Sequence, residues 1–169
     1  MSLLFQNVTI YDPSSRHHLK KKDILIKNGK IERVAKIESD ALPASTEIIK
    51  NAAVTPGFID LFSHFCDPGF EHKETIETGL KAASEGGFTH VAAMPNTQPC
   101  VHSKSEVEYL RNKGASSACS LHPLGAISKN CEGKEITEIY DMHDAGAVAF
   151  TDGINSTLSA GLTLRALLY

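Results

Sequence analysis

The alternation of apolar and polar residues gives the first part of the chain the pattern of β-structure. Runs typical of half-buried strands cover residues 3–11, 23–27, 30–35 and 47–49. Asn28-Gly29 provides a two-residue hairpin turn, because both residues tolerate positive φ. The polar, proline-containing stretch 36–46 is predicted to be a loop. We therefore predict part of a small β-sandwich over residues 1–53.

From Val54 onward, strand-like and helix-like stretches alternate. Strand-like runs cover residues 57–62, 89–94, 117–124 and 147–151. Apolar residues recur at helical spacing in residues 73–85, 103–113, 132–145 and from 156 to the end, where Leu158 opens the apolar series. Strand–helix repeats at a spacing of about 30 residues indicate a parallel sheet with helices packed outside it.

The length of this second part sets how much of a barrel it encodes. A complete (β/α)₈ barrel typically takes about 250 residues, so residues 54–169 predict an α/β fold of about four βα units, the N-terminal half of a TIM barrel. Such a layer would leave a strand edge and one apolar sheet face uncovered. The sequence therefore favours either a truncated chain or a half-barrel that associates, for example as a homo-oligomer.

Composition narrows the classes of function and location. The 169 residues are 41% hydrophobic and 22% charged with a net charge of −3, which is ordinary for a globular protein and gives no argument for nucleic-acid or membrane binding. The basic run 16–22 is predicted to be a solvated hairpin tip. No apolar stretch reaches the roughly 18 residues of a membrane span, and the N-terminus lacks signal-peptide character. Four dispersed cysteines without an export signal predict free thiols and a cytoplasmic location.

Short motifs with turn-forming and polar residues lie at the boundaries of the predicted barrel elements. In the first of them an apolar run leads to His64 and then to the turn Asp67-Pro68-Gly69. The motifs occupy residues 55–69, 69–76, 82–89, 94–99, 123–129 and 146–153.

Together these motifs resemble the class I dihydroorotases of the amidohydrolase superfamily, over nearly the whole chain. Residues 94–97, Met-Pro-Asn-Thr, carry the most specific match, to the signature that ends strand two. The resemblance implies a metal-dependent hydrolase-like TIM barrel of pyrimidine biosynthesis. In that family, zinc hydroxide interconverts the small-molecule substrate dihydroorotate and carbamoyl aspartate by opening or closing a cyclic amide.

The resemblance also implies roles for individual residues. His64 corresponds to the second His of the family's zinc-binding His-x-His pair, Asp152 to the strand-four metal carboxylate, and Asn96 to a substrate-binding residue. All three follow predicted strands, where substrate sites of this architecture lie. Zinc suits the reaction because it lowers the pKa of bound water towards 7.

Two positions of the first motif depart from the family pattern. Phe62 stands at the first His position and has no lone pair for a metal, while Cys66 stands where the family has an Arg that binds the substrate carboxylate. The family's further ligands and its catalytic Asp belong to strands five to eight. Since one His and one Asp are too few ligands for tight zinc binding, we assign no catalytic residue and expect weak or no activity.

Several alternatives stay open at this point. A second functional hypothesis is a non-catalytic dihydroorotase-like scaffold that binds aspartate transcarbamoylase, and a third is a hydantoinase or allantoinase. Cys66 is either a metal ligand beside His64 or a small buried apolar residue. Asn96 and Asp152 would equally suit turns, and His64 would suit an ordinary loop.

Overall fold

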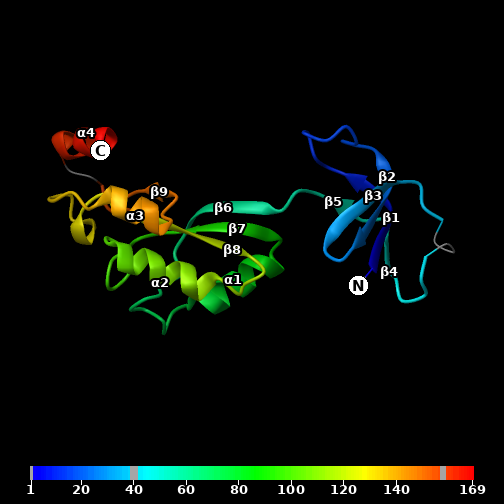
Figure 1. Ribbon diagram of the computed structural model, residues 1–169, viewed down its shortest axis with the longest axis horizontal. Helices are drawn as coiled ribbons and strands as arrows, with labels where there is room; N and C mark the ends of the chain where they lie inside the picture. Colours follow the sequence, from blue (N-terminus) through cyan, green and yellow to red (C-terminus); the bar gives the residue numbers. More distant parts are fainter. Residues whose placement is uncertain (1, 39–41, 157–158) are drawn as a thin grey trace. The chain divides into compact units, whose positions relative to one another are not determined.

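The computed structural model describes residues 2–38, 42–156 and 159–169, which form two compact units (Figure 1). The first unit comprises residues 1–56 and the second residues 57–169. Among the described residues, none of the helices combines the length and apolar character needed to cross a bilayer.

The first unit is built on one mixed sheet. Its strands are β1 (Ser2–Ile10), β2 (Lys21–Lys27), β3 (Lys30–Ala35), β4 (Glu47–Lys50) and β5 (Ala53–Val54). The order is β3-β2-β1-β4, with antiparallel pairs β1–β2 and β2–β3, while β4 and β5 both lie parallel to β1. The predicted strands and the turn at Asn28-Gly29 are confirmed, but Lys21 and Lys22 of the basic run belong to β2. The part of the loop prediction that falls on residues 39–41 lies outside the described residues.

The second unit is a parallel sheet with helical connections. Its strands are β6 (Phe58–Ser63), β7 (Phe88–Ala93), β8 (Ser120–Gly125) and β9 (Ala149–Phe150). They lie in the order β6-β7-β8-β9, and every neighbouring pair is parallel. The helices are α1 (Ile76–Glu85), α2 (Lys104–Gly114), α3 (Ile139–Ala145) and α4 (Ala160–Leu168). Figure 1 shows α1 and α2 on the same side of this sheet.

The third helix is shorter than the sequence predicts. It begins at Ile139 rather than near residue 132, because the residues before it form other hydrogen bonds. Ile136 forms a β-bridge with Ser128, and the Thr137 hydroxyl donates to the carbonyl of Ala126 at 2.6 Å. Such local hydrogen bonds compete with a helix that hydrophobic periodicity alone would predict. In the last predicted helix, Leu158 lies outside the described residues.

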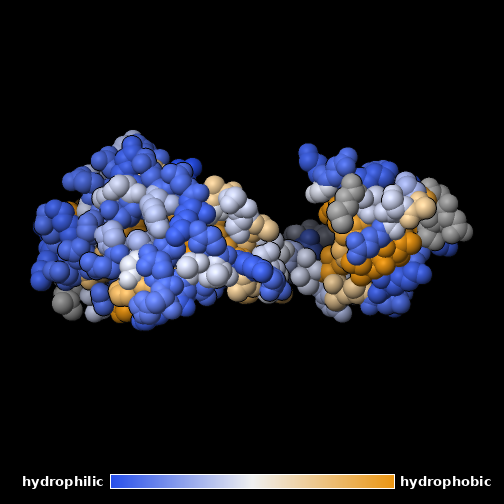
Figure 2. Space-filling view, turned by 90° about the horizontal axis from the view of Figure 1, so that it is seen from below, coloured by the Kyte–Doolittle hydropathy of each residue, from blue (hydrophilic) through white to orange (hydrophobic). Residues whose placement is uncertain are grey.

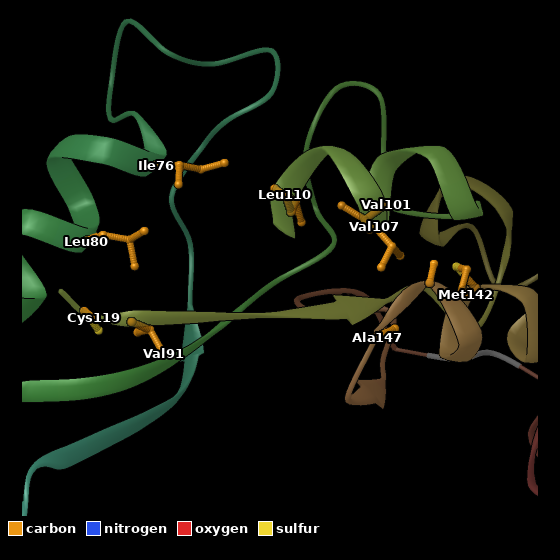
Figure 3. Packing of buried hydrophobic residues seen from close by; sticks show 10 residues of the cluster. Ile76, Leu80, Val91, Val101, Val107, Leu110, Cys119, Met142 and Ala147 are labelled. Atoms are coloured by element: carbon orange, nitrogen blue, oxygen red, sulfur yellow. The ribbon is translucent and has the colours of Figure 1, made fainter. Parts of the chain in front are cut away.

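The core of the second unit lies between the sheet and its helices. The buried cluster comprises Ile76, Leu80, Val91, Val101, Val107, Leu110, Cys119, Met142, Ala145 and Ala147. Figure 3 shows side chains from α1 and α2 directed towards the strand layer that carries Val91. In the view of Figure 2 this unit presents mainly hydrophilic residues, whereas the first unit presents a broad hydrophobic area. The helices therefore bury their apolar stripes against one sheet face and leave polar residues outside.

A buried carboxylate fixes the connection between β6 and α1. Asp67 is 1% exposed and accepts hydrogen bonds from the Ile76 backbone N–H, Tyr109 Oη and Lys113 Nζ at 3.1, 2.9 and 2.7 Å. Burial by itself would raise the pKa of Asp67, but the hydrogen bonds from Lys113, Ile76 and Tyr109 together outweigh it and lower the pKa. Asp67 thereby joins the β6–α1 loop to the first turn of α1 and to α2.

Leu110 tests the packing of α2 on the sheet. Leu110→Ala should lower the free energy of unfolding by about 2–5 kcal/mol, because the side chain is 1% exposed and its loss leaves a cavity in the core. Leu167→Ala on α4 is the matched control, since Leu167 is 80% exposed, and its effect should stay within about 0.5 kcal/mol. Urea denaturation followed by circular dichroism measures both. Equal effects of the two substitutions would contradict the assigned core.

Asp67→Asn should destabilise the protein by about 3 kcal/mol at pH 7, because it leaves the partly buried Lys113 ammonium without its charged partner. The folded-state pKa of Asp67 lies below its unfolded value of about 3.9. The stability from this carboxylate is therefore present above about pH 4 and is lost as pH falls through the folded-state pKa. The difference between Asp67→Asn and the native chain should consequently narrow between pH 7 and pH 3 in urea titrations.

The control for this charge effect is Glu85→Gln, since Glu85 forms an exposed pair with Lys81 at 4.0 Å. We expect a change below about 0.5 kcal/mol at every pH. A destabilisation by Asp67→Asn that stays constant down to pH 3 would assign the effect to packing instead of charge.

Candidate functional site

The three candidate site residues lie beyond the carboxyl ends of three parallel strands. His64 directly follows β6, Asn96 lies three residues after β7, and Asp152 lies two residues after β9. Because the strands are parallel and adjacent in sequence order, these ends share one edge of the sheet. The structure thus brings together the residues that the sequence places at separate strand ends.

Asn96 connects the other two residues. His64 Nε2 lies 2.8 Å from the Asn96 backbone oxygen, and since a carbonyl can only accept, the proton resides on Nε2. The Asn96 side chain donates from Nδ2 to the backbone oxygen of Asp152 at 3.1 Å and accepts at Oδ1 from the Ile154 N–H at 3.3 Å. Gly153 has a φ of +65°, and a Cβ there would collide with the Asn96 amide, so this contact requires glycine. The loops after β7 and β9 are therefore joined through one amide group.

Asp152 is buried and holds the β8–α3 loop. Its residue exposure is 2%, and its two carboxylate oxygens accept from the Ser128 backbone N–H at 2.8 Å and from Ser128 Oγ at 2.7 Å. Ser128 Oγ also accepts from the Gly133 N–H at 2.7 Å. Sequence reasoning missed Ser128 as a site residue. Its only signal was its place in the 123–129 motif, because a contact across 24 residues leaves no periodic pattern.

The two departures from the family pattern differ in their surroundings. Phe62 lies near the end of β6 and is 51% exposed, so an aromatic ring projects where the resemblance implies an imidazole. Cys66 is buried, with φ at +62°, and its Sγ lies 3.9 Å from His64 Nδ1, a long distance for the weak thiol donor. A buried thiol does not offer the charged, forked donor that binds a carboxylate.

The described residues do not fit a catalytic zinc ion. Protein ligands of catalytic zinc normally number three, and the described part of the chain holds no group of three or more His, Cys, Asp or Glu placed to bind a metal. His64 keeps one lone pair, on Nδ1, because Nε2 donates to Asn96. The carboxylate of Asp152 accepts from Ser128 through both oxygens. The arrangement is a hydrogen-bonded polar cluster that joins loops.

A protein-family model described as dihydro-orotase-like matches residues 52–168. Among curated proteins, the chain is 40% identical to a dihydroorotase of Pelotomaculum thermopropionicum over 173 residues, covering 100% of the chain and 39% of that protein. It is 39% identical over 170 residues to a dihydroorotase of Aquifex aeolicus, covering 99% of the chain and 39% of that protein. The chain thus spans about two fifths of the length of these relatives.

Solved structures with the same arrangement are amidohydrolases. An L-hydantoinase from Arthrobacter aurescens superposes with a TM-score of 0.72 at 23% identity, covering 97% of the chain and 37% of that enzyme. A dihydroorotase crystal structure superposes with a TM-score of 0.60 at 16% identity, covering 88% of the chain and 41% of that protein. At these identities the likeness concerns the fold, and it confirms the predicted N-terminal half of an amidohydrolase-type TIM barrel. The family match and the sequence identities show that the chain belongs to the dihydroorotase family of cyclic amidohydrolases.

Proposed function

We propose that this member of the dihydroorotase family has little or no cyclic-amide hydrolase activity. The observation that carries the proposal is the set of side chains at the strand ends. Phe62 supplies no metal ligand, and the carboxylate of Asp152 is hydrogen-bonded to Ser128. The metal-dependent mechanism of the family needs a zinc-bound hydroxide. The described residues supply too few ligands to hold the ion that would generate it.

The substrate expected from the family is dihydroorotate or carbamoyl aspartate. Asn96 can offer it the second Nδ2 proton, because the first is donated to Asp152. Cys66 in place of the family's Arg removes the charge-assisted contact to the substrate carboxylate. We therefore expect any binding of dihydroorotate to be weak.

The purified protein, supplied with zinc and then desalted, should retain well under one zinc per chain. It should convert dihydroorotate no faster than a blank without protein. Elemental analysis measures the first quantity and a spectrophotometric assay the second, with the Aquifex aeolicus dihydroorotase as the positive control. Phe62→His should not restore turnover, since Cys66 still lacks the charge-assisted contact with the substrate carboxylate. Zinc-dependent turnover by the native chain would refute the proposal.

A second candidate function is a non-catalytic scaffold for aspartate transcarbamoylase. The observation that favours it is the difference between two sets of residues. Asn96 and Gly153 make the contacts that hold the loops at the strand ends. Phe62 and Cys66, in contrast, lack the metal-binding and substrate-binding groups that the family has at these positions. A protein that serves only as a binding surface would need the fold and not the metal. Free cysteines at all four positions favour a reducing, cytoplasmic setting for such a complex.

Light scattering coupled to gel filtration tests the scaffold hypothesis. The protein mixed with aspartate transcarbamoylase should elute as a complex heavier than either component, and an unrelated protein of similar mass should show no shift. The protein injected alone reports in the same experiment whether it forms a homo-oligomer. Separate elution of the two components at micromolar concentrations would count against the scaffold.

A further inference from the structure

Two buried cysteines from different loops lie in direct contact. Cys100 belongs to the loop between β7 and α2, and Cys131 ends a short 3₁₀ turn (Lys129–Cys131) between β8 and α3. Their Sγ atoms are 3.2 Å apart, and the residues are 6% and 4% exposed. Together with Ala126 they form a small apolar cluster separate from the main core. Both are free thiols.

The other two cysteines have different surroundings. Cys66 faces His64, and Cys119 lies in the main core near Val91 (Figure 3). A disulfide has an S–S distance of about 2.05 Å, so the Cys100 and Cys131 sulfurs need to approach by about 1 Å. That movement is within the reach of side-chain and loop adjustment. The residues on either side of Cys131, Asn130 and Glu132, are exposed, so Cys131 lies in a segment at the surface of the protein.

We propose that Cys100 and Cys131 form a redox modification site at which a hydroperoxide generates a reversible disulfide between the β7–α2 and β8–α3 loops. The inference rests on the contact between the two sulfurs and does not depend on the proposed function.

The contact gives the two sulfurs different roles. The hydrogen-bonded contact with Cys100 lowers the pKa of Cys131, against the raising effect of burial. The same hydrogen bond, together with burial, raises the pKa of Cys100. Both neighbours of Cys131 are exposed, whereas Val101 beside Cys100 is buried, so we expect Cys131 to react first and Cys100 to be the resolving thiol.

The reaction proceeds in two balanced steps. In the first, the Cys131 thiolate attacks one peroxide oxygen, an S–O bond forms, and the O–O bond breaks. The departing oxygen takes up the proton released by Cys131 and leaves as water or an alcohol. In the second, Cys100 attacks the Cys131 sulfur, the S–S bond forms, and the S–O bond breaks. The released hydroxide takes the Cys100 proton and leaves as water. The two sulfurs lose two electrons and the hydroperoxide gains two; a dithiol reverses the oxidation.

The disulfide would restrain the loops that make up the candidate site. Asn96 lies on the same loop as Cys100, and Ser128, which binds Asp152, lies on the same loop as Cys131. The side chain of Asn155 donates to the Cys131 carbonyl at 3.0 Å, which extends the connection to the segment after β9. Cross-linking residues 100 and 131 also removes conformational freedom from the unfolded chain. We expect the Tm of the oxidised protein to exceed that of the reduced protein by about 5–10 °C.

The test treats the native folded protein with hydrogen peroxide, blocks the remaining thiols and maps the peptides by mass spectrometry. We expect a cross-linked peptide pair containing Cys100 and Cys131, a mass loss of two hydrogens, the rise in Tm, and reversal of all three by dithiothreitol. Cys66→Ala and Cys119→Ala are the matched controls and should both still form the cross-link. Cys100→Ala should prevent it and leave Cys131 as a sulfenic acid that dimedone traps.

The decisive measurements are made on the native chain, so the proposal stays testable if a variant fails to fold. Absence of the Cys100–Cys131 peptide after oxidation of folded protein would overturn it. Formation of that peptide only in urea would overturn it as well, because the folded contact would then have no part in the reaction.

Discussion

The burial of one face of a parallel sheet by α1 and α2 is the constraint on which the rest of the second unit depends. Leu80 from α1 and Leu110 from α2 are each 1% exposed, and they lie in one cluster with Val91 of β7. Because each helix returns the chain to the same end of the sheet, the strands run parallel and their carboxyl ends share one edge. The polar cluster of His64, Asn96 and Asp152 at that edge is thus a consequence of how the helices pack.

The loops at this edge of the sheet are held by hydrogen bonds between side chains and backbone groups of the protein. In the loop after β6, Asp67 accepts hydrogen bonds from Ile76 of α1 and from Tyr109 and Lys113 of α2. Asp152 accepts hydrogen bonds from Ser128 in the loop after β8. A buried carboxylate is costly unless it is hydrogen-bonded or paired with charge. Asp67 therefore ties its own loop to α1 and α2, and Asp152 fixes the path of the β8–α3 loop that supplies its donors. The described side chains and backbone groups supply this order through these hydrogen bonds.

The sequence predicted the elements whose pattern is local. The strands near residues 57–62 and 89–94 and the hairpin at Asn28-Gly29 follow from hydrophobic periodicity and turn chemistry, and the structure has them within a few residues. The helix predicted from residue 132 was wrong at its start, because Thr137 and Ser128 form hydrogen bonds that periodicity does not reveal. The same limit applies to the site. His64, Asn96 and Asp152 could be placed at strand ends. The contacts of Ser128 with Asp152 and of Cys100 with Cys131 join positions that are distant in the sequence, so no local pattern predicts them.

The contacts of Asn96 and Asp152 also bear on what such motifs mean in this fold. The Asn96 amide bonds the backbone on both sides of Gly153, and the Asp152 carboxylate bonds the backbone and side chain of Ser128. Replacing either residue would leave loop backbone groups without partners, whether or not a metal is bound. Loop structure therefore gives each of them a role that does not depend on a metal. Phe62 and Cys66 carry no comparable set of hydrogen bonds from their side chains, so these positions can differ from the family pattern without disturbing the strand ends. The Met-Pro-Asn-Thr and Thr-Asp-Gly segments of this chain thus carry hydrogen bonds that the loops themselves require.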